Sequence, residues 1–196
     1  GYQVEAFMRM GKGVPRSKEC LELFMTHWVF WAGLPKNIVT DRGLNNRGVF
    51  AREMSAAGVY CGTIGLEAPV QLSKTERHGG MWKYVAQRVV EAKKLKSIQE
   101  LKIMAAEVSA VMNEQNRSGG FSPAQWVIGR QPRHTAELGD DETRHDLGSM
   151  SERVDPTTEF GRRMQIRHEA KKAYVHLDSG RRVQAALTRK AVAQKS

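Results

Sequence analysis

Two carboxylates, Asp41 and Glu76, have neighbours that could give them a chemical role. Asp41 follows the run Ile-Val-Thr at residues 38–40, whose residue types favour a buried strand, and Arg42-Gly43 then turns the chain. We therefore expect Asp41 at the carboxyl end of a strand, where open α/β sheets collect their functional groups. Glu76 comes 35 positions later, at the start of a long helical pattern.

One carboxylate from a strand end and one from a helix could hold divalent metal ions. Mg²⁺ prefers hard oxygen ligands and keeps several waters, so a few carboxylates are enough to bind it. Two such ions, about 3.5–4 Å apart, can drive phosphodiester transfer. The alternative is structural, because an Asp after a strand is often a turn residue and a Glu at a helix start often complements the helix dipole.

Basic residues flank both carboxylates and could bind phosphate groups. They are Arg42, Lys74, Arg77 and Lys83. A solvated basic surface without a ligand is the alternative interpretation.

The bulk composition favours a polyanionic partner. The chain has 196 residues, a net charge of +10 and a pI of about 9.9, which indicates nucleic acid first and an anionic membrane second. Its two cysteines, Cys20 and Cys61, are far apart, which excludes a disulfide scaffold and suits a reducing compartment. The longest apolar run, residues 28–34, is too short to cross a bilayer, and no signal-peptide pattern is present. We expect a nuclear or cytoplasmic protein that does not bind a membrane.

Apolar periodicity and turn residues predict strands and helices in alternation. The expected elements are a strand at 2–9, a helix from Ser17 to Gly33, a strand ending at Asp41, a helix at 49–57, a strand at 59–64, a mobile loop at 65–75, and helices at 76–96, 97–116 and 122–128. Gly79-Gly80 should weaken the start of the helix that carries Glu76. Ser97 and Glu100 form a capping-box pattern.

The composition changes twice after residue 133. Residues 134–159 carry eight acidic and two basic side chains and few apolar ones, which predicts a linker. Residues 160–196 carry ten basic and two acidic side chains and predict a helical tail, broken at Ser179-Gly180. The basic run favours salt-sensitive, sequence-independent phosphate contact, and a flexible solvated helix is the alternative. It comprises Arg162, Arg163, Arg167, Lys171, Lys172, Arg181, Arg182, Arg189 and Lys190.

Three motifs in order resemble the catalytic core of retroviral and retrotransposon integrases. Residues 31–43, Trp-Ala-Gly-Leu-Pro-Lys-Asn-Ile-Val-Thr-Asp-Arg-Gly, are similar to the segment around that family's second aspartate. Glu76-Arg77 resembles the glutamate that closes its D,D-35-E triad. Residues 116–123 and 129–133 are similar to the end of the core in long-terminal-repeat retrotransposons. The resemblance covers about residues 1–133.

The resemblance implies an α/β fold of the RNase H-like class, with a mixed sheet flanked by helices. It implies that the first strand and the first aspartate of the triad lie before residue 1, so that this chain supplies two of three metal ligands, Asp41 and Glu76. Residues 1–133 would be a partial catalytic core, 134–159 an acidic linker and 160–196 a basic helical tail.

The implied activity of the intact parent is 3′-end processing and strand transfer with Mg²⁺ or Mn²⁺. The implied partners are element-end DNA, target DNA and further copies of the chain. Phosphate contacts are expected from Arg42, Lys74, Arg77, Lys83, Arg162, Arg163, Lys171 and Lys172. Two alternatives stay open: a non-catalytic nucleic-acid-binding remnant, and an interaction module.

Overall fold

The chain forms two compact units, each with its own hydrophobic core. The computed structural model describes residues 15–41, 43–63, 69–117, 119–130, 155 and 157–193. The N-terminal unit is Ala6–Gly79, and the C-terminal unit is Gly80–Ser196 together with Gly1–Glu5. The predicted strand at residues 2–9 and nearly all of the predicted linker lie outside the described residues.

The N-terminal unit opens with one helical run that follows the predicted bounds. It comprises α1 (Ser17–Phe24), a π-helical turn (Met25–Val29) and α2 (Phe30–Ala32), and it ends at Gly33 with a φ of 75°. Ser17 is the first helical residue of this run. Its hydroxyl donates to the carbonyl of Arg47 and accepts from the backbone N–H of Phe50, and so ties α1 to the next helix.

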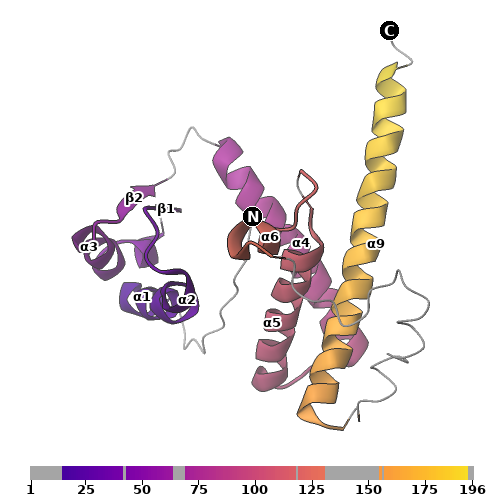
Figure 1. Ribbon diagram of the computed structural model, residues 1–196, viewed down its shortest axis with the longest axis horizontal. Coiled ribbons are helices and arrows are strands. Elements are labelled where there is room, and N and C mark those ends of the chain that lie inside the picture. The colour runs from indigo at the N-terminus through magenta and orange to yellow at the C-terminus, as the bar shows by residue number, and fades with distance from the viewer. Residues whose placement is uncertain are drawn as a thin grey trace. The chain divides into compact units, whose positions relative to one another are not determined.

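A β-α-β segment follows this helical run (Figure 1). Strand β1 (Asn37–Thr40) pairs in parallel with β2 (Tyr60–Thr63), and a 3-10 turn (Leu44–Asn46) and α3 (Val49–Ala56) connect them. Gly58, at a φ of 77°, ends α3 in a left-handed conformation that favours glycine. Phe50, Met54 and Val59 form the buried core, against which Phe24 and Ile38 pack.

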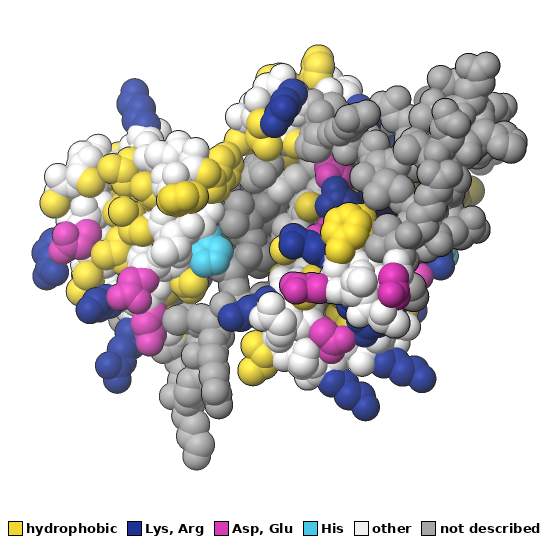
Figure 2. Space-filling view, turned by 60° about the horizontal axis from the view of Figure 1, so that its bottom comes forward, with side chains coloured by type: hydrophobic (Ala, Val, Ile, Leu, Met, Phe, Trp, Pro, Cys, Tyr) yellow, Lys and Arg dark blue, Asp and Glu magenta, His cyan; other side chains and the backbone are white. Residues whose placement is uncertain are grey.

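The outer face of this small sheet stays open. Val39 and Tyr60 point away from the core and are exposed by 60% and 70%. Figure 2 shows hydrophobic side chains gathered on the viewer's side of this unit. The large exposed ones in the unit are Met25, Phe30, Trp31, Leu34, Val39 and Tyr60.

The C-terminal unit is a bundle of long helices. Helix α4 (Pro69–Lys93) contributes its residues from Gly80 onward, and α5 (Ile98–Gln115), α6 (Pro123–Ile128) and α9 (Glu159–Ala193) complete the described part. Side-chain and backbone bonds confirm the predicted capping box at Ser97, and a second capping box is present at Ser122. The buried core comprises Met81, Trp82, Val85, Ala86, Val89, Leu95, Met104, Ala105, Val108, Val111, Met112, Ile166, Ala170 and Tyr174.

Contacts along α9 fix the direction of the three long helices. Near its start Arg162 meets Glu100, at the beginning of α5, and further on Arg167 meets Glu114, at the end of α5. Helices α5 and α9 therefore run in the same direction. Arg162 also bonds the carbonyl of Lys93, whereas Arg181 contacts Met81, so the C-terminal part of α4 runs the opposite way.

The prediction of an RNase H-like fold, with a mixed sheet flanked by helices, is wrong. The described residues are mostly helical and contain one sheet, of two parallel strands. Beyond residue 63 the described sequence carries helical apolar spacing and capping signals, so it supplies no further run suited to a strand. No helix in the described ranges is long and apolar enough to cross a membrane.

Two helix boundaries also differ from the prediction. Helix α4 begins at Pro69, so all of the described part of the expected loop at 65–75 is helical, and the helix continues through Gly79-Gly80. Helix α9 runs unbroken through Ser179-Gly180. A glycine costs a helix only about 1 kcal/mol relative to alanine, which neighbouring turns and tertiary packing can offset.

Candidate functional site

Asp41 lies directly after the carboxyl end of β1, as the sequence predicts. Its side chain is exposed, and its Oδ1 accepts hydrogen bonds from the backbone N–H of Gly43 at 3.0 Å and from Asn46 Nδ2 at 2.5 Å. Both donors belong to the turn that follows the strand. They hold the carboxylate in place while it remains open to solvent, which suits a metal ligand and equally a turn residue.

Gly43 allows this turn to close tightly. A Cβ added at Gly43 would lie 2.4 Å from Asn45 Oδ1 and 3.0 Å from Asp41 Oδ1, too close for any side chain without a shift. Both atoms are the ends of side chains, so a larger residue at position 43 would displace Asn45 and Asp41 rather than meet the backbone. Glycine thus leaves the hydrogen bonds of the Asp41 carboxylate undisturbed.

Glu76 lies on α4, within the same compact unit as Asp41, and its side chain is exposed. Next to it Arg77 is exposed and His78 is half-buried. The backbone of Lys74 is helical, but its side chain and the whole of Arg42 lie outside the described residues. The structure places the two predicted carboxylates on different elements, and no contact joins them.

The donor chemistry of Asp41 and Glu76 fits Mg²⁺ or Mn²⁺, because carboxylate oxygens are the hard ligands that these ions take. Within the described ranges, no group of three or more His, Cys, Asp or Glu side chains is placed to hold a metal ion. Two carboxylates would leave the remaining coordination positions to water and to phosphate oxygens. Metal bound there would polarise a phosphodiester and activate a hydroxyl nucleophile.

The remaining predicted phosphate-binding residues lie in the C-terminal unit. Lys83 is exposed on α4, and Lys172 is exposed on α9, 3.5 Å from Glu169. Lys171 is half-buried, and its pKa is lowered by burial and by the nearby charge of Arg167. Of these three lysines, Lys83 and Lys172 are the more accessible to a phosphate.

Arg162 and Arg163 instead join a row of ion pairs between α9 and α5. Arg162 meets Glu100 at 2.8 Å, while Arg163 and Arg167 both bond Glu107. Arg167 also bonds Glu114. Glu107 and Glu114 are buried, with side chains exposed by 4% and 5%. Burial opposes the charge of Arg167, yet the two glutamates outweigh it and raise its pKa.

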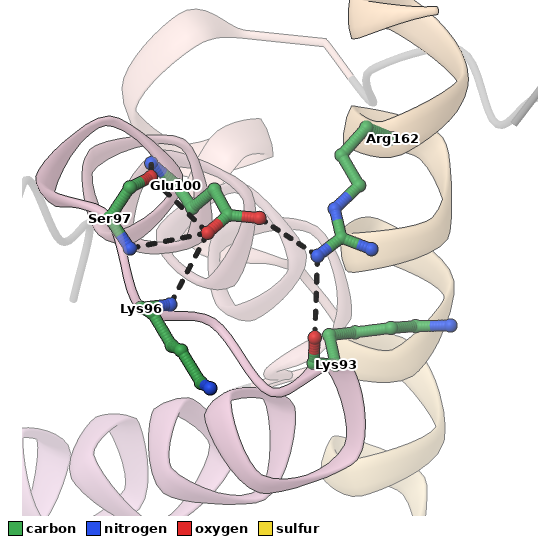
Figure 3. A network of polar contacts seen from close by, with 5 residues as sticks. All are labelled: Lys93, Lys96, Ser97, Glu100 and Arg162. Atoms are coloured by element: carbon green, nitrogen blue, oxygen red, sulfur yellow. Dashed lines mark hydrogen bonds and ion pairs between the residues drawn. The ribbon is translucent and has the colours of Figure 1, made fainter. Parts of the chain in front are cut away.

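The first pair of this row also organises the start of α5 (Figure 3). Glu100 accepts from the backbone N–H groups of Lys96 and Ser97 and from Arg162, which in turn donates to the carbonyl of Lys93. These bonds, that of Arg162 foremost, lower the pKa of Glu100 to about 2. One carboxylate thus caps α5 and holds α9 beside the end of α4.

The sequence analysis did not identify this row, although the sequence carries a signal for it. Glu100, Glu107 and Glu114 recur every seven residues along one face of an otherwise largely apolar helix. Heptad spacing keeps side chains on the seam that faces a partner helix. This spacing therefore predicts that α5 presents a row of acidic side chains to a basic partner helix.

Comparisons of the chain with protein families, with curated proteins and with solved structures found no match. The integrase resemblance therefore rests on the three sequence motifs and on the position of Asp41.

Proposed function

We propose that the chain is part of an integrase of retrotransposon type, which in its intact parent trims and joins DNA ends by metal-assisted phosphodiester transfer. The position of Asp41 carries the proposal. An exposed carboxylate, held by its own turn at the carboxyl end of a parallel strand, is suited to bind a catalytic metal ion. The order of the three motifs supports it.

Asp41 and Glu76 are the proposed metal ligands, for Mg²⁺ or Mn²⁺. Element-end DNA and target DNA are the proposed substrates, and the net charge of +10 favours their approach. Further copies of the chain are proposed as partners, in the nucleus or the cytoplasm. Arg42, Lys74, Arg77 and Lys83 are proposed to contact phosphates close to the chemistry.

The test is strand transfer by the purified chain on labelled element-end DNA with Mn²⁺, beside Asp41→Asn and Glu76→Gln. Glu53→Gln is the matched control, because Glu53 is an exposed carboxylate of the same unit that pairs with Arg52 at 3.1 Å. We expect product from the wild type and from the control and none from the two variants. Equal product from all four proteins would contradict the proposal.

Metal binding gives a second readout that does not depend on turnover. Mn²⁺ is paramagnetic and broadens the amide resonances of nearby residues, so the residues around Asp41 should lose signal in the wild type. Asp41→Asn should keep those signals at the same Mn²⁺ concentration. Equal broadening in both proteins would remove Asp41 from the metal site.

A nucleic-acid-binding protein without catalysis is the second candidate. It is favoured by one observation, that the described residues hold no group of three potential metal ligands. In that case we expect no strand-transfer product. DNA affinity should fall steeply with salt concentration and should be the same in the wild type, Asp41→Asn and Glu76→Gln.

A further inference from the structure

Helix α9 consists of two halves with different surroundings. Residues 159–178 pack into the bundle, where Ile166, Ala170 and Tyr174 are buried. From Ser179 through Thr188 every side chain is exposed, including Val183 at 58% and Leu187 at 63%. Figure 1 shows the yellow end of α9 continuing beyond α5. The helix has 35 residues, about 52 Å at 1.5 Å each, against 18 residues and about 27 Å for α5.

The charges of the packed half are largely matched within the bundle. Arg162, Arg163 and Arg167 pair with glutamates of α5, two of which are buried. Drawing Arg167 away to a phosphate would take a partner from the buried Glu107 and from the buried Glu114, which costs several kcal/mol, and drawing Arg163 away would take one of two partners from Glu107. This half therefore serves the fold.

The distal segment of α9 (residues 179–193), which begins with this exposed stretch, has the opposite charge pattern. Its sequence contains four basic residues and no acidic one. Arg182 pairs with Asp178, the last acidic residue of the chain, at 2.7 Å and stays 79% exposed, and Arg181 contacts the neutral thioether of Met81. The four are Arg181, Arg182, Arg189 and Lys190.

We infer that the distal segment of α9 is a contact for the phosphates of a nucleic-acid duplex, and that the packed half is a brace that orients it. The inference rests on the proposed function, and it assigns the phosphate contact within the tail to residues beyond the ion-paired arginines. An α-helix fits the major groove of a duplex, and Lys and Arg side chains on it reach the phosphates on either side.

The charge of the distal segment decides among the possible occupants. A symmetric contact with a second copy through this segment would bring two acid-free basic segments together, and like charges repel. A membrane-surface helix carries Trp, Phe or Leu on an apolar face, whereas this segment has no aromatic residue and one leucine. A polyanion matches the observed charge, since each phosphate contact releases a bound counterion.

The test measures binding of the full chain to a fluorescent 30-base-pair duplex by anisotropy between 50 and 200 mM NaCl. The distal variant replaces Arg181, Arg182, Arg189 and Lys190 with Gln, a good helix former. The control variant makes the same change at four exposed basic residues elsewhere: Lys18, Arg52, Arg88 and Lys102. Both variants have four fewer charges, so a difference between them reports position rather than net charge. Helical circular dichroism checks that each variant is folded.

We expect the distal variant to reduce the slope of log K against log salt by about 3–4, at roughly 0.9 for each phosphate that is no longer neutralised. Its affinity at 100 mM NaCl should fall at least tenfold, while the control variant should change the slope by less than about 1. An unchanged slope in the distal variant, with wild-type binding intact, would overturn the inference and leave the proposed function standing. No duplex binding by the wild type would overturn both. Binding to phosphatidylserine vesicles but not to duplex would assign the segment to membranes.

Discussion

At Glu107 a single buried carboxylate holds two arginines of another helix, Arg163 and Arg167. Glu107→Gln keeps the shape of the side chain but removes its charge, and leaves both guanidinium groups with a weaker acceptor. We expect the free energy of unfolding to fall by about 2 kcal/mol or more. The loss should be smaller than that for a fully buried ion pair, because Arg163 is half exposed. Urea unfolding measures the change.

Glu91→Gln is the control for this prediction. Glu91 pairs with Arg88 at 3.9 Å, and both side chains are more than half exposed. Exposed pairs of this kind contribute less than about 1 kcal/mol, so the variant should unfold close to the wild type. Equal losses in the two variants would show that the α5–α9 row stabilises the bundle no more than a surface pair does.

Glu100 makes stability depend on pH in a predictable direction. Its pKa, lowered to about 2 by Arg162 and by the backbone N–H groups of Lys96 and Ser97, lies below the ordinary value of 4.5. A depressed pKa stabilises the fold above about pH 4.5, and this contribution disappears as the pH falls toward 2. Glu100→Gln cannot titrate, so its stability should fall less steeply between pH 4.5 and 2.

Urea midpoints measured at half-unit intervals of pH test this prediction. Arg162→Gln is the companion variant, because it keeps the carboxylate but removes the main cause of the shift. Its loss of stability should therefore be confined to a narrower range, just below pH 4.5. If all three proteins had parallel profiles, Glu100 would not be the group responsible.

At the scale of an element, the continuity of α9 through Gly180 can be tested by one substitution. Gly180 is helical, and an added Cβ would meet nothing within 4 Å. Gly180→Ala should therefore stabilise this part of the helix by about 0.5–1 kcal/mol. Amide exchange of residues 177–185 measures the gain.

Gly58→Ala is the matched change with the opposite expected sign. Gly58 also has open space around it, but its φ of 77° disfavours any residue with a Cβ. The substitution should destabilise the end of α3 by about 1–2 kcal/mol. A destabilised α9 in Gly180→Ala would indicate a break at this glycine, as the sequence analysis expected.

These two glycines show why the sequence predicted some boundaries and not others. Gly58 follows a short apolar pattern, and the helix ends there as expected. Gly180 follows a helix whose preceding turns are held by Ile166, Ala170 and Tyr174, and that packing offsets a local preference of about 1 kcal/mol. The capping box at Ser97 could be predicted because its signal lies within four neighbouring residues. The extent of the sheet could not, because strand pairing depends on residues far apart in the chain.

The candidate site also has features that the sequence predicts and features that it does not. The position of Asp41 follows from its neighbours alone, because a β-branched run and a tight turn determine where the carboxylate lies. The basic run alone does not predict that Arg162 and Arg163 form ion pairs with α5. These pairs depend on glutamates more than fifty residues away.

At the scale of the whole molecule, the two units differ in how much core they contain. Among the described residues, the N-terminal unit buries three hydrophobic side chains in its core cluster and the C-terminal unit fourteen. Local unfolding follows the amount of buried apolar contact. We expect the amides of β1 and β2 to exchange through openings of lower free energy than those of α5, as measured by native-state hydrogen exchange in low urea.

Met54→Ala is the internal check on this prediction. Met54 is 3% exposed, and truncating a buried methionine costs about 2–5 kcal/mol, so β1 and β2 should then open still more easily. A common opening free energy for β1, β2 and α5 in the wild type would mean that the chain unfolds as one cooperative body despite its separate cores.

The same exchange measurement connects this difference in stability to the proposed function. An ion that binds only the folded form at one hundred times its Kd stabilises it by about 2.7 kcal/mol. If Asp41 binds metal, Mn²⁺ should slow exchange at β1, which the carboxylate follows directly. Asp41→Asn should remove that effect without removing any general effect of ionic strength. Binding of the ion would then stabilise β1 against local unfolding. If Mn²⁺ slowed amide exchange at β1 equally in the wild type and in Asp41→Asn, the ion would bind elsewhere.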